Sequence, residues 1–489
     1  MQERERKFAV AAEVTTAAVA AALAGEHAPP PAAVPAVLLA TYFDTGRLDL
    51  AGAGITLRRR EGGSDAGWHL KLPASKDERT EYWLPLSAGS GPEVPADLAE
   101  MVGGQAGGRR LRPVAQLRTF RTTVQLPGAG AGAATVAELA DDRVVAVRRR
   151  DGALVAWREL EIEARRGGES GLDDLERRLA ELGAVRSPFP SKLARVLAAP
   201  APPEVDADPV VARLAAQVAT VIAGEGAVRR GDDEALHDVR VAVRRLRSCL
   251  RSFEDAFAEG ATSPLVADLR EIGQVLGGAR DADVLAARLE EALETVPASD
   301  VLGPVRAVLR ARAARTSAAA GHALDALIDG AHFADVLEAL VAFVAAPPFA
   351  AQRRGRRYYA ARLAHEHRRV ARAVAAAEDL EGSAREGALH EVRKAAKRAR
   401  YAAETVEPAL GAPARRAAER YSELQDALGA YHDAVVARAV LREEGARAGV
   451  RPGENGFTFG LLHALEDGRA AAAERRFVTR WRRARRALS

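Results

Sequence analysis

The chain has 489 residues, which is more than one hydrophobic core usually organises, and this length predicts two or three domains. Its formal net charge is only +4, so net charge alone gives little indication of a polyanionic partner, and clusters of basic residues must carry any such case. A single cysteine, Cys249, excludes an internal disulfide framework and a multi-cysteine zinc site, and it suits a reducing cytoplasm.

The first 195 residues contain short runs of β-branched and aromatic residues separated by glycine and proline clusters, a pattern typical of strands and turns. The predicted strands cover residues 4–10, 41–45, 55–60, 68–73, 79–86, 120–126, 135–142, 143–149 and 157–164. One helix is predicted over 171–182, and the proline-rich stretch 198–209 is interpreted as a linker. This part of the chain is therefore expected to be mostly antiparallel sheet.

From residue 210 onwards, long runs of alanine, leucine and arginine follow the helical period. The segment LHDVRVAVRRLRSCLRSFE (236–254) recurs as LHEVRKAAKRARYAAETVE (389–407), and VLGGARDADV (275–284) recurs as ALGAYHDAVV (427–436). This order predicts a duplicated helical unit with pseudo-twofold symmetry. The expected organisation is a first domain over 1–197, a linker over 198–209 and an all-α domain of two pseudo-symmetric bundles over 210–489.

Two apolar stretches do not predict insertion into a membrane. Residues 17–24 imitate the core of a signal peptide, but Glu3, Glu5 and Glu13 interrupt the basic and apolar regions that such a signal requires. The stretch 339–351 is interrupted by proline and is too short to cross a bilayer. We expect a cytoplasmic protein without a membrane partner.

Charged residues recur on one face of several predicted strands. In an extended strand Glu3, Glu5 and Lys7 share one face. The same alternation groups Arg58 with Arg60, His69 with Lys71, Arg79 with Glu81, and Glu159 with Glu161 and Glu163. For a single strand, a solvated face explains the pattern. Five such strands favour a closed barrel with a polar interior, where basic residues bind an anion and carboxylates hold the accompanying cation.

These motifs resemble the CYTH superfamily, the triphosphate tunnel metalloenzymes. The resemblance covers about residues 1–197 and includes, in order, Glu3-x-Glu5-x-Lys7, YFDT, Arg58 with Arg60, Lys71, Arg79-x-Glu81, RTFR, ELEIE and SKLARVL. It implies an eight-stranded antiparallel β-tunnel that hydrolyses or cyclises triphosphates with Mg²⁺ or Mn²⁺.

The resemblance also implies roles for individual residues. The expected catalytic residues are Glu3, Glu5 and Lys7, with Glu3 completing the metal cluster or orienting the water. The expected substrate-binding residues are Arg58, Arg60, Lys71, Arg79, Glu81, Arg118, Arg121 and Lys192, and the expected metal ligands are Glu5, Glu138, Glu161 and Glu163. Guanidinium and ammonium groups suit phosphoryl oxygens, and carboxylates suit hard divalent ions. In the strand 135–142, Glu138 and Asp142 share one face and Asp141 does not, so the sequence leaves open which of these carboxylates faces inward.

The repeated helical segment carries a basic face. Helical periodicity places His237, Arg240, Arg244, Arg247 and Arg251 within an arc of about 80°. The second copy presents His390, Arg393, Lys397 and Arg400 in the same arrangement. A solvated face with an incidental histidine is the alternative interpretation. Because both copies carry histidine at the same offset, this alternative is disfavoured.

Together with GGARDADV and GAYHDAVV, these segments resemble the CHAD domain, a helical domain named for its conserved histidines, over about residues 205–489. The resemblance implies binding of inorganic polyphosphate to a basic surface between two helical bundles. A row of arginine and lysine suffices for a polyanion without sequence, and histidine would add a titratable contact. The expected polyphosphate-binding residues are His237, Arg240, Arg244, Arg247, Arg251, Arg353, Arg357, His390, Arg393, Lys397 and Arg400.

The sequence thus predicts a divalent-metal-dependent inorganic triphosphatase joined to a polyphosphate-binding domain, in the cytoplasm or at polyphosphate granules. The alternative is a non-catalytic polyphosphate-binding or granule-associated protein with a degenerate tunnel. Adenylate cyclase shares the tunnel, but the helical half favours an inorganic substrate. Nucleic acid is disfavoured as a partner, because the aromatic residues that stack on bases make up only 5% of the chain.

Overall fold

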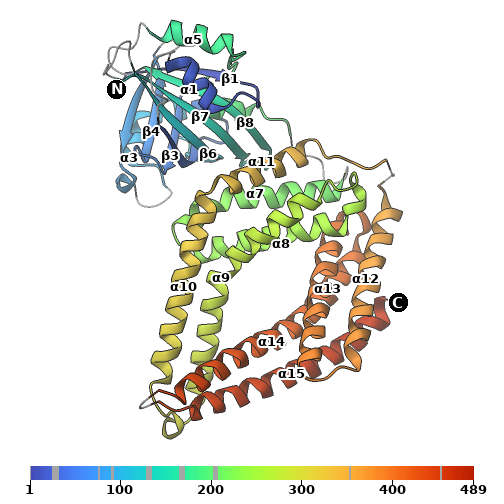
Figure 1. The fold of residues 1–489 in the computed structure, drawn as a ribbon. Helices are drawn as coiled ribbons and strands as arrows, with labels where there is room; N and C mark the ends of the chain where they lie inside the picture. Colours follow the sequence, from blue (N-terminus) through green and yellow to red (C-terminus); the bar gives the residue numbers. More distant parts are fainter. Residues whose placement is uncertain are drawn as a thin grey trace. The chain divides into compact units, whose positions relative to one another are not determined.

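The computed structural model describes residues 2–24, 32–74, 78–89, 93–127, 135–164, 171–201, 208–351, 354–451 and 454–488. The chain forms two compact units (Figure 1). The first comprises Met1–Pro202, Val218–Arg230 and Asp329–Ala346, and the second comprises Pro203–Gln217, Gly231–Ile328 and Pro347–Ser489. These units do not coincide with the predicted domains, because two segments that follow the predicted linker pack with the sheet of the first unit.

The first unit is built on an antiparallel sheet closed into a barrel. Its strands are β1 (Gln2–Ala9), β2 (Ala33–Asp44), β3 (Thr56–Glu61), β4 (Gly67–Pro73), β5 (Glu78–Leu84), β6 (Arg112–Pro127), β7 (Thr135–Arg148), β8 (Leu154–Ala164) and β9 (Val185–Arg186). They follow the order β5-β4-β3-β2-β6-β7-β8-β1-β9, and pairing of β5 with β1 closes the ring. The predicted eight-stranded tunnel is confirmed, with the two-residue β9 added beside β1.

Several predicted strand boundaries were wrong. β6 begins at Arg112, eight residues before the predicted start at 120. β2 begins at Ala33, eight residues before the predicted start, because AVPAVLLA pairs with β6 although its alanines and proline lower its β-propensity. The predicted strands 135–142 and 143–149 form one continuous strand, β7. Its central charged residues did not break the strand, because Asp141 pairs with Arg158 on the neighbouring β8.

Apolar residues of the barrel point outward and are covered by helices. α1 (Thr16–Ala24) and α5 (Leu172–Glu181) cover β1, β6, β7 and β8, and bury Val19, Leu23 and Leu175 against them. The signal-like run 17–24 is therefore part of this core. α2 (Asp49–Gly52), α3 (Ala96–Met101) and α4 (Gly103–Ala106) cover β2 to β4. α6 (Lys192–Leu197) packs Leu193 and Val196 against inward-facing apolar side chains at one end of the barrel.

Two helical segments from later in the chain complete the first unit. They are the second half of α7 (Pro209–Arg229) and α11 (Ala331–Ala345). On β6, the Arg118 guanidinium is 1% exposed, lies 3.0 Å from Glu225 Oε2 of α7 and stacks over the Phe333 ring of α11. α7 is long and apolar enough to span a membrane by composition, and half of its apolar window is buried inside the protein, as in core helices of the same hydropathy.

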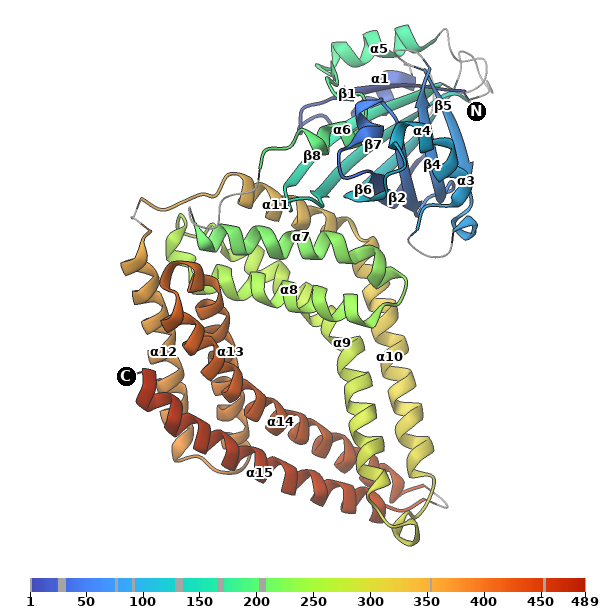
Figure 2. The same ribbon diagram turned by 180° about the vertical axis from the view of Figure 1, so that it is seen from behind.

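The second unit consists of long helices (Figure 2). They are α8 (Asp233–Ser252), α9 (Ser263–Glu294), α10 (Val305–Asp329), α12 (Arg356–Glu378), α13 (Gly382–Leu410), α14 (Ala412–Ala448) and α15 (Phe457–Leu488). The repeated segments lie at equivalent places, in α8 and α13 and in α9 and α14, and α8 packs directly against α13. α12 to α15 share one core, whose largest fully buried side chain is Tyr421.

We predict that Glu225→Ala destabilises the full chain by about 3 to 5 kcal/mol, because it removes the buried carboxylate that lies 3.0 Å from the Arg118 guanidinium. Replacing the pair together, with Arg118→Met and Glu225→Leu, should restore most of the stability. Urea unfolding followed by tryptophan fluorescence measures both. Asp329→Ala is the control, since this 60% exposed carboxylate pairs with Arg229 at the surface and should matter by less than about 1 kcal/mol. Wild-type stability of Glu225→Ala would refute the structural role of the pair.

Candidate active site in the barrel

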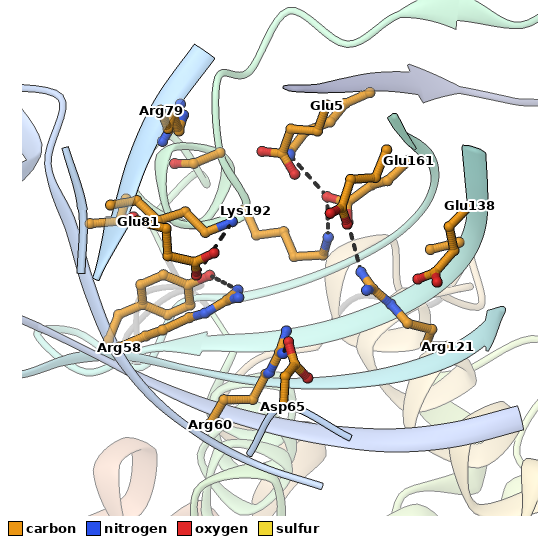
Figure 3. Close-up of a pocket in the computed structure, with 17 residues that line it drawn as sticks. Glu5, Arg58, Arg60, Asp65, Arg79, Glu81, Arg121, Glu138, Glu161 and Lys192 are labelled. Carbon is orange, nitrogen blue, oxygen red and sulfur yellow. Dashed lines mark hydrogen bonds and ion pairs between the residues drawn. The ribbon is translucent and has the colours of Figure 1, made fainter. Parts of the chain in front are cut away.

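The barrel encloses a polar cavity (Figure 3). Strands β1 to β8 and the start of α6 all contribute to its lining, which consists of Glu5, Lys7, Tyr42, Thr56, Arg58, Arg60, Asp65, Lys71, Arg79, Glu81, Arg121, Glu138, Ala140, Glu161, Glu163, Ser191 and Lys192. Figure 3 shows Glu5, Glu161 and Glu138 on one side with Arg121 among them, and Arg58 and Arg60 on the other with Glu81 and Asp65 beside them. We call the side richer in carboxylates the acidic wall and the side richer in guanidinium groups the basic wall.

Strand register explains this separation. Glu5 is paired with Glu163, and Lys7 with Glu161, so β1 and β8 present matching rows to the interior. β7 adds Glu138 beside Glu163. On the opposite side, Thr56 of β3, Lys71 of β4 and Glu81 of β5 form one cross-strand row. Because alternate residues share a face, the strand pattern in the sequence was sufficient to identify most of the lining.

Glu161 is at the centre of the acidic wall. Its carboxylate lies 2.6 Å from Arg121 Nη2, 2.6 Å from Lys192 Nζ and 3.0 Å from Lys7 Nζ. Burial alone would raise the pKa of Glu161, but Lys192, Lys7 and Arg121 hold it well below its usual range. Glu5 responds in the same way: burial opposes its charge, and Lys7 and Lys71 nevertheless lower its pKa to about 2. Both residues are ionised at neutral pH.

Two further carboxylates lie behind the predicted metal ligands. Asp142 is fully buried and accepts hydrogen bonds from Arg121 Nε at 2.7 Å and Nη2 at 2.6 Å. Glu159 Oε2 accepts a hydrogen bond from Trp157 Nε1 at 2.8 Å. Oxygens of Asp142, Glu159 and Glu161 lie within 4.8 Å of one another, and Lys192 Nζ lies within 2.8 Å of all three residues.

This donor set suits a hard divalent cation, because such ions prefer several carboxylate oxygens. Glu5, Glu138, Glu161 and Glu163 line the cavity, and carboxylate oxygens of Asp142, Glu159 and Glu161 lie close enough together to hold a metal ion. The Lys192 ammonium group compensates Asp142 and Glu159.

The strand pattern placed Glu159 on the face of Glu161 and left open whether Asp142 faces inward, but neither residue was given a role in the site. The structure places Glu138 and Asp142 on the inner face of β7 and pairs Asp141 with Arg158, and the proximity of Asp142 to Glu159 comes from the register of β7 with β8.

The basic wall has more positive charge than its partners neutralise. Arg60 forms an ion pair with Asp65, and Arg58 Nη1 donates to the Tyr42 hydroxyl at 3.4 Å. Buried Nε atoms of Arg58 and Arg60 have no hydrogen-bond partner among the described residues. Burial, together with Arg58 and Arg121, lowers the pKa of Arg60 to about 9. An anion in the cavity would relieve this crowding of cations.

Several residues in and around the site were not predicted. Tyr42, Thr56, Asp65 and Ser191 line the cavity, and only the strand face of the first two was visible in the sequence. His69, whose strand face was recognised, lies just behind the lining. Its Nδ1 is 2.8 Å from Glu81 Oε1 and its Nε2 is 2.9 Å from the Asp65 carbonyl oxygen, so it fixes two lining residues.

Two predicted tunnel residues are not among the described lining. Arg118 was predicted to bind substrate, but it lies on the outer face of β6 with Glu225. It is three positions from the inward-facing Arg121, and strand faces alternate at every residue. Glu3 is paired with Arg79 through the β1 and β5 backbones, and its side chain lies outside the described residues. The remaining predicted tunnel residues meet in one cavity.

Part of the predicted polyphosphate surface forms a cation cluster between α8 and α13. It contains Arg240, Arg244 and Arg247 of α8 with Arg393 and Lys397 of α13, and its arginines act together on the charge of Lys397. Arg240 Nη2 lies 2.8 Å from Asp281 Oδ1 of α9. None of the described carboxylates forms an ion pair with the other four, and the buried Nε atoms of Arg244 and Arg393 have no hydrogen-bond partner there.

Other residues of the predicted set are placed differently. Arg400 pairs with Glu404 on its own helix at 2.8 Å, and Arg357 is exposed near the start of α12. His237 and Arg251 are exposed at opposite ends of α8, while the His390 ring lies 4.8 Å from that of His432 on α14. Arg353 lies outside the described residues.

We predict that Lys192→Met destabilises the protein by about 3 to 5 kcal/mol at neutral pH, because three buried carboxylates lose their shared cation. Without the Lys192 ammonium group, the pKa values of Asp142 and Glu161 would rise from their lowered values, because burial opposes the charge of both. The stability lost relative to the wild type would therefore grow as pH rises through these raised values. The loss in melting temperature should therefore be larger at pH 8 than at pH 5, and Mg²⁺ should reduce it.

Thermal unfolding of the two proteins with and without Mg²⁺ measures these effects. Lys394→Met is the matched control, since this lysine is 57% exposed and pairs with Glu391 on the surface. A Lys192→Met protein with the same melting temperature as the wild type at both pH values would contradict the assignment.

Comparison with known proteins supports a first domain followed by a helical one, as the sequence predicts. A family model described as the CYTH domain matches residues 1–197, and one described as the CHAD domain matches residues 212–442. Uncharacterized proteins from two Mycobacterium tuberculosis strains are each 37% identical over 452 residues, which cover 87% of this chain and 86% of theirs.

Two solved structures are also similar to parts of the chain. PptA from Streptomyces chartreusis is 20% identical, with a TM-score of 0.47, over 56% of this chain and 98% of its own. The CHAD domain from the plant Ricinus communis is 25% identical, with a TM-score of 0.42, over 54% of this chain and 86% of its own.

Proposed function

Because this chain belongs to the proteins that join a CYTH domain to a CHAD domain, we propose that its tunnel hydrolyses inorganic triphosphate with the help of Mg²⁺ or Mn²⁺. The observation that carries the proposal is the division of one closed cavity into an acidic wall and a basic wall. A complex of a divalent cation with a short polyphosphate has this same division of charge.

The basic wall would bind the phosphoryl groups. Arg58 and Arg60 are oriented by Tyr42 and Asp65 and retain donors that a phosphoryl oxygen would satisfy. Lys71 adds a point charge in the same cavity. These side chains already face inward, so substrate binding would need little rearrangement of them.

The acidic wall would provide the cation site. A divalent ion held by Glu5, Glu138, Glu161 and Glu163 would neutralise phosphate charge and activate water for attack. Lys7, Arg121 and Lys192, which now compensate Glu161, would then be available to phosphoryl oxygens. The water oxygen would form a bond to the terminal phosphorus while the bond between that phosphorus and the bridging oxygen breaks. The products would be orthophosphate and pyrophosphate, and a proton of the water would be released.

The helical unit is proposed to bind inorganic polyphosphate at the α8–α13 cation cluster. Its uncompensated charge supports a polyanionic ligand, and its regular spacing along two helices suits a repeating one. In the alternative, the chain only binds polyphosphate and the tunnel is inactive. The alternative is favoured if no triphosphate is hydrolysed while polyphosphate still binds.

We predict that Glu161→Gln lowers the rate of triphosphate hydrolysis by at least about 100-fold, because it removes a charged ligand from the acidic wall with little change in volume. Release of orthophosphate from triphosphate, longer polyphosphates, ATP and thiamine triphosphate, with Mg²⁺ or Mn²⁺, measures the activity and the preferred substrate. Glu181→Gln is the control, because this carboxylate is 66% exposed on α5. Full activity of Glu161→Gln would exclude the proposed cation site.

We also predict that Arg244→Ala with Arg393→Ala weakens polyphosphate binding by about 10- to 100-fold, since each removes one charge-assisted contact at a partly exposed site. The slope of log affinity against log salt should become shallower by about two. Arg415→Ala with Arg476→Ala removes two exposed arginines from α14 and α15 and should have little effect. Equal losses in both double variants would indicate a diffuse basic surface rather than a site at α8 and α13.

A further inference from the structure

Lys397 is the only lysine in the α8–α13 cation cluster. Arg240, Arg244 and Arg247 face it from α8, and Arg393 faces it from one turn earlier on its own helix. His432 faces the same region from α14. Lys397 is partly buried, and none of the described carboxylates pairs with it.

The internal repeat shows that a lysine here is a departure from symmetry. Alignment of residues 236–254 with 389–407 places Lys397 opposite Arg244, whereas Arg240 matches Arg393. At this position one copy therefore carries an ammonium group where the other carries a guanidinium. This difference matters because arginine stays charged in proteins, while a buried lysine can release its proton.

When several cations crowd together without a counter-charge, the group that yields its proton most easily becomes neutral. Burial, followed by Arg244, Arg393, Arg240 and Arg247, lowers the pKa of Lys397 to about 7. A polyanion bound between α8 and α13 would offset the repulsion between Lys397 and the neighbouring arginines. It would therefore favour the charged form of the lysine.

We propose that polyphosphate binds the α8–α13 cation cluster together with one proton, and that Lys397 is the residue that takes it up. The inference rests on the proposed polyphosphate binding and adds its linkage to pH. The binding energy of the polyanion includes the charging of Lys397, so the affinity falls as pH rises from the pKa of the free protein towards that of the complex.

Two neighbouring histidines are harder to protonate than an ordinary imidazole. Burial, Arg393 and His390 lower the pKa of His432 to about 4, and burial with Lys394 and Arg393 lowers that of His390. A Lys397→Arg variant separates proton uptake at Lys397 from uptake at either ring. Asp281 and Asp433 are the nearby acids; Asp281 is engaged with Arg240, and Asp433 lies near Arg393.

The proton can be counted by calorimetry. The full chain is titrated with inorganic polyphosphate of one length in two buffers of different ionisation enthalpy. From a pKa of about 7, uptake at Lys397 should be about 0.9 proton at pH 8 and about 0.1 at pH 6. The same linkage weakens binding about tenfold between pH 6 and pH 8.

Lys397→Arg is the decisive variant, because it keeps the charge, removes the titration and restores the symmetry with Arg244. At pH 8 the proton uptake measured with this variant should be about 0.9 lower than with the wild type. Any protons that the polyphosphate itself takes up contribute equally to both titrations. The swap of Lys397→Arg with Arg244→Lys should restore the uptake from the other copy. Uptake by Lys397→Arg equal to that of the wild type would overturn the proposal.

Amine labelling tests the free protein without polyphosphate. Lys397 and Lys394 are the two lysines of the helical unit, three residues apart, and Lys394 is the exposed control paired with Glu391. After reductive methylation with isotopic formaldehyde, the NMR signal of Lys397 should titrate near pH 7. A signal that stays charged to pH 9 would refute the inference even if polyphosphate binds. If Lys397 titrates near pH 7 but the protein does not bind polyphosphate, the proposed ligand is refuted, and so is proton uptake linked to its binding.

Discussion

A closed barrel that turns its charged face inward must compensate almost every charge it buries. This constraint organises the first unit. Glu161 alone is contacted by Lys7, Arg121 and Lys192, and Lys192 also compensates Asp142 and Glu159. Because the apolar faces of the strands are left outside, the barrel depends on α1, α5 and the small helices after β2 and β5 to cover them. The covering helices and the polar cavity therefore both follow from the placement of charged side chains inside the barrel and apolar side chains outside it.

Charge compensation differs between the two walls of the cavity, and this difference bears on the kind of ligand that would fit. Glu161 of the acidic wall is compensated by ammonium and guanidinium groups, whereas Arg58 and Arg60 of the basic wall have buried donors without a hydrogen-bond partner in the described part of the chain. A cation and a polyanion entering together would satisfy both walls. In the helical unit the imbalance goes further, since four cations between α8 and α13 lack an ion-pair partner among the described residues. Both units thus retain positive charge for anionic ligands, although their folds are unrelated.

Much of this arrangement could be predicted from the sequence, because alternation along a strand and periodicity along a helix determine which side chains share a face. Glu5, Lys7, Arg58 and Glu161 were identified in this way. Arg118 was placed in the site by its motif, against its strand face, and the structure puts it outside with Glu225. Asp142 and Glu159 were missed as a pair since their proximity arises from register between β7 and β8.

Contacts between distant segments were beyond the reach of the sequence. The ion pair of Arg118 joins residues 107 positions apart, and nothing local in α7 identifies Glu225 as its partner. The unusual state of Lys397 likewise depends on three arginines from another helix. Periodicity predicted two basic faces in α8 and α13, but only their packing against each other creates the burial and the crowding of cations that lower the pKa of Lys397.

The most direct test of the tunnel's function is hydrolysis of inorganic triphosphate by the full chain in ¹⁸O-labelled water with Mg²⁺ or Mn²⁺. If water attacks the terminal phosphorus in the cavity, each turnover places one ¹⁸O in the orthophosphate and none in the pyrophosphate. Label in the pyrophosphate, or no metal-dependent release of orthophosphate at all, would contradict the account.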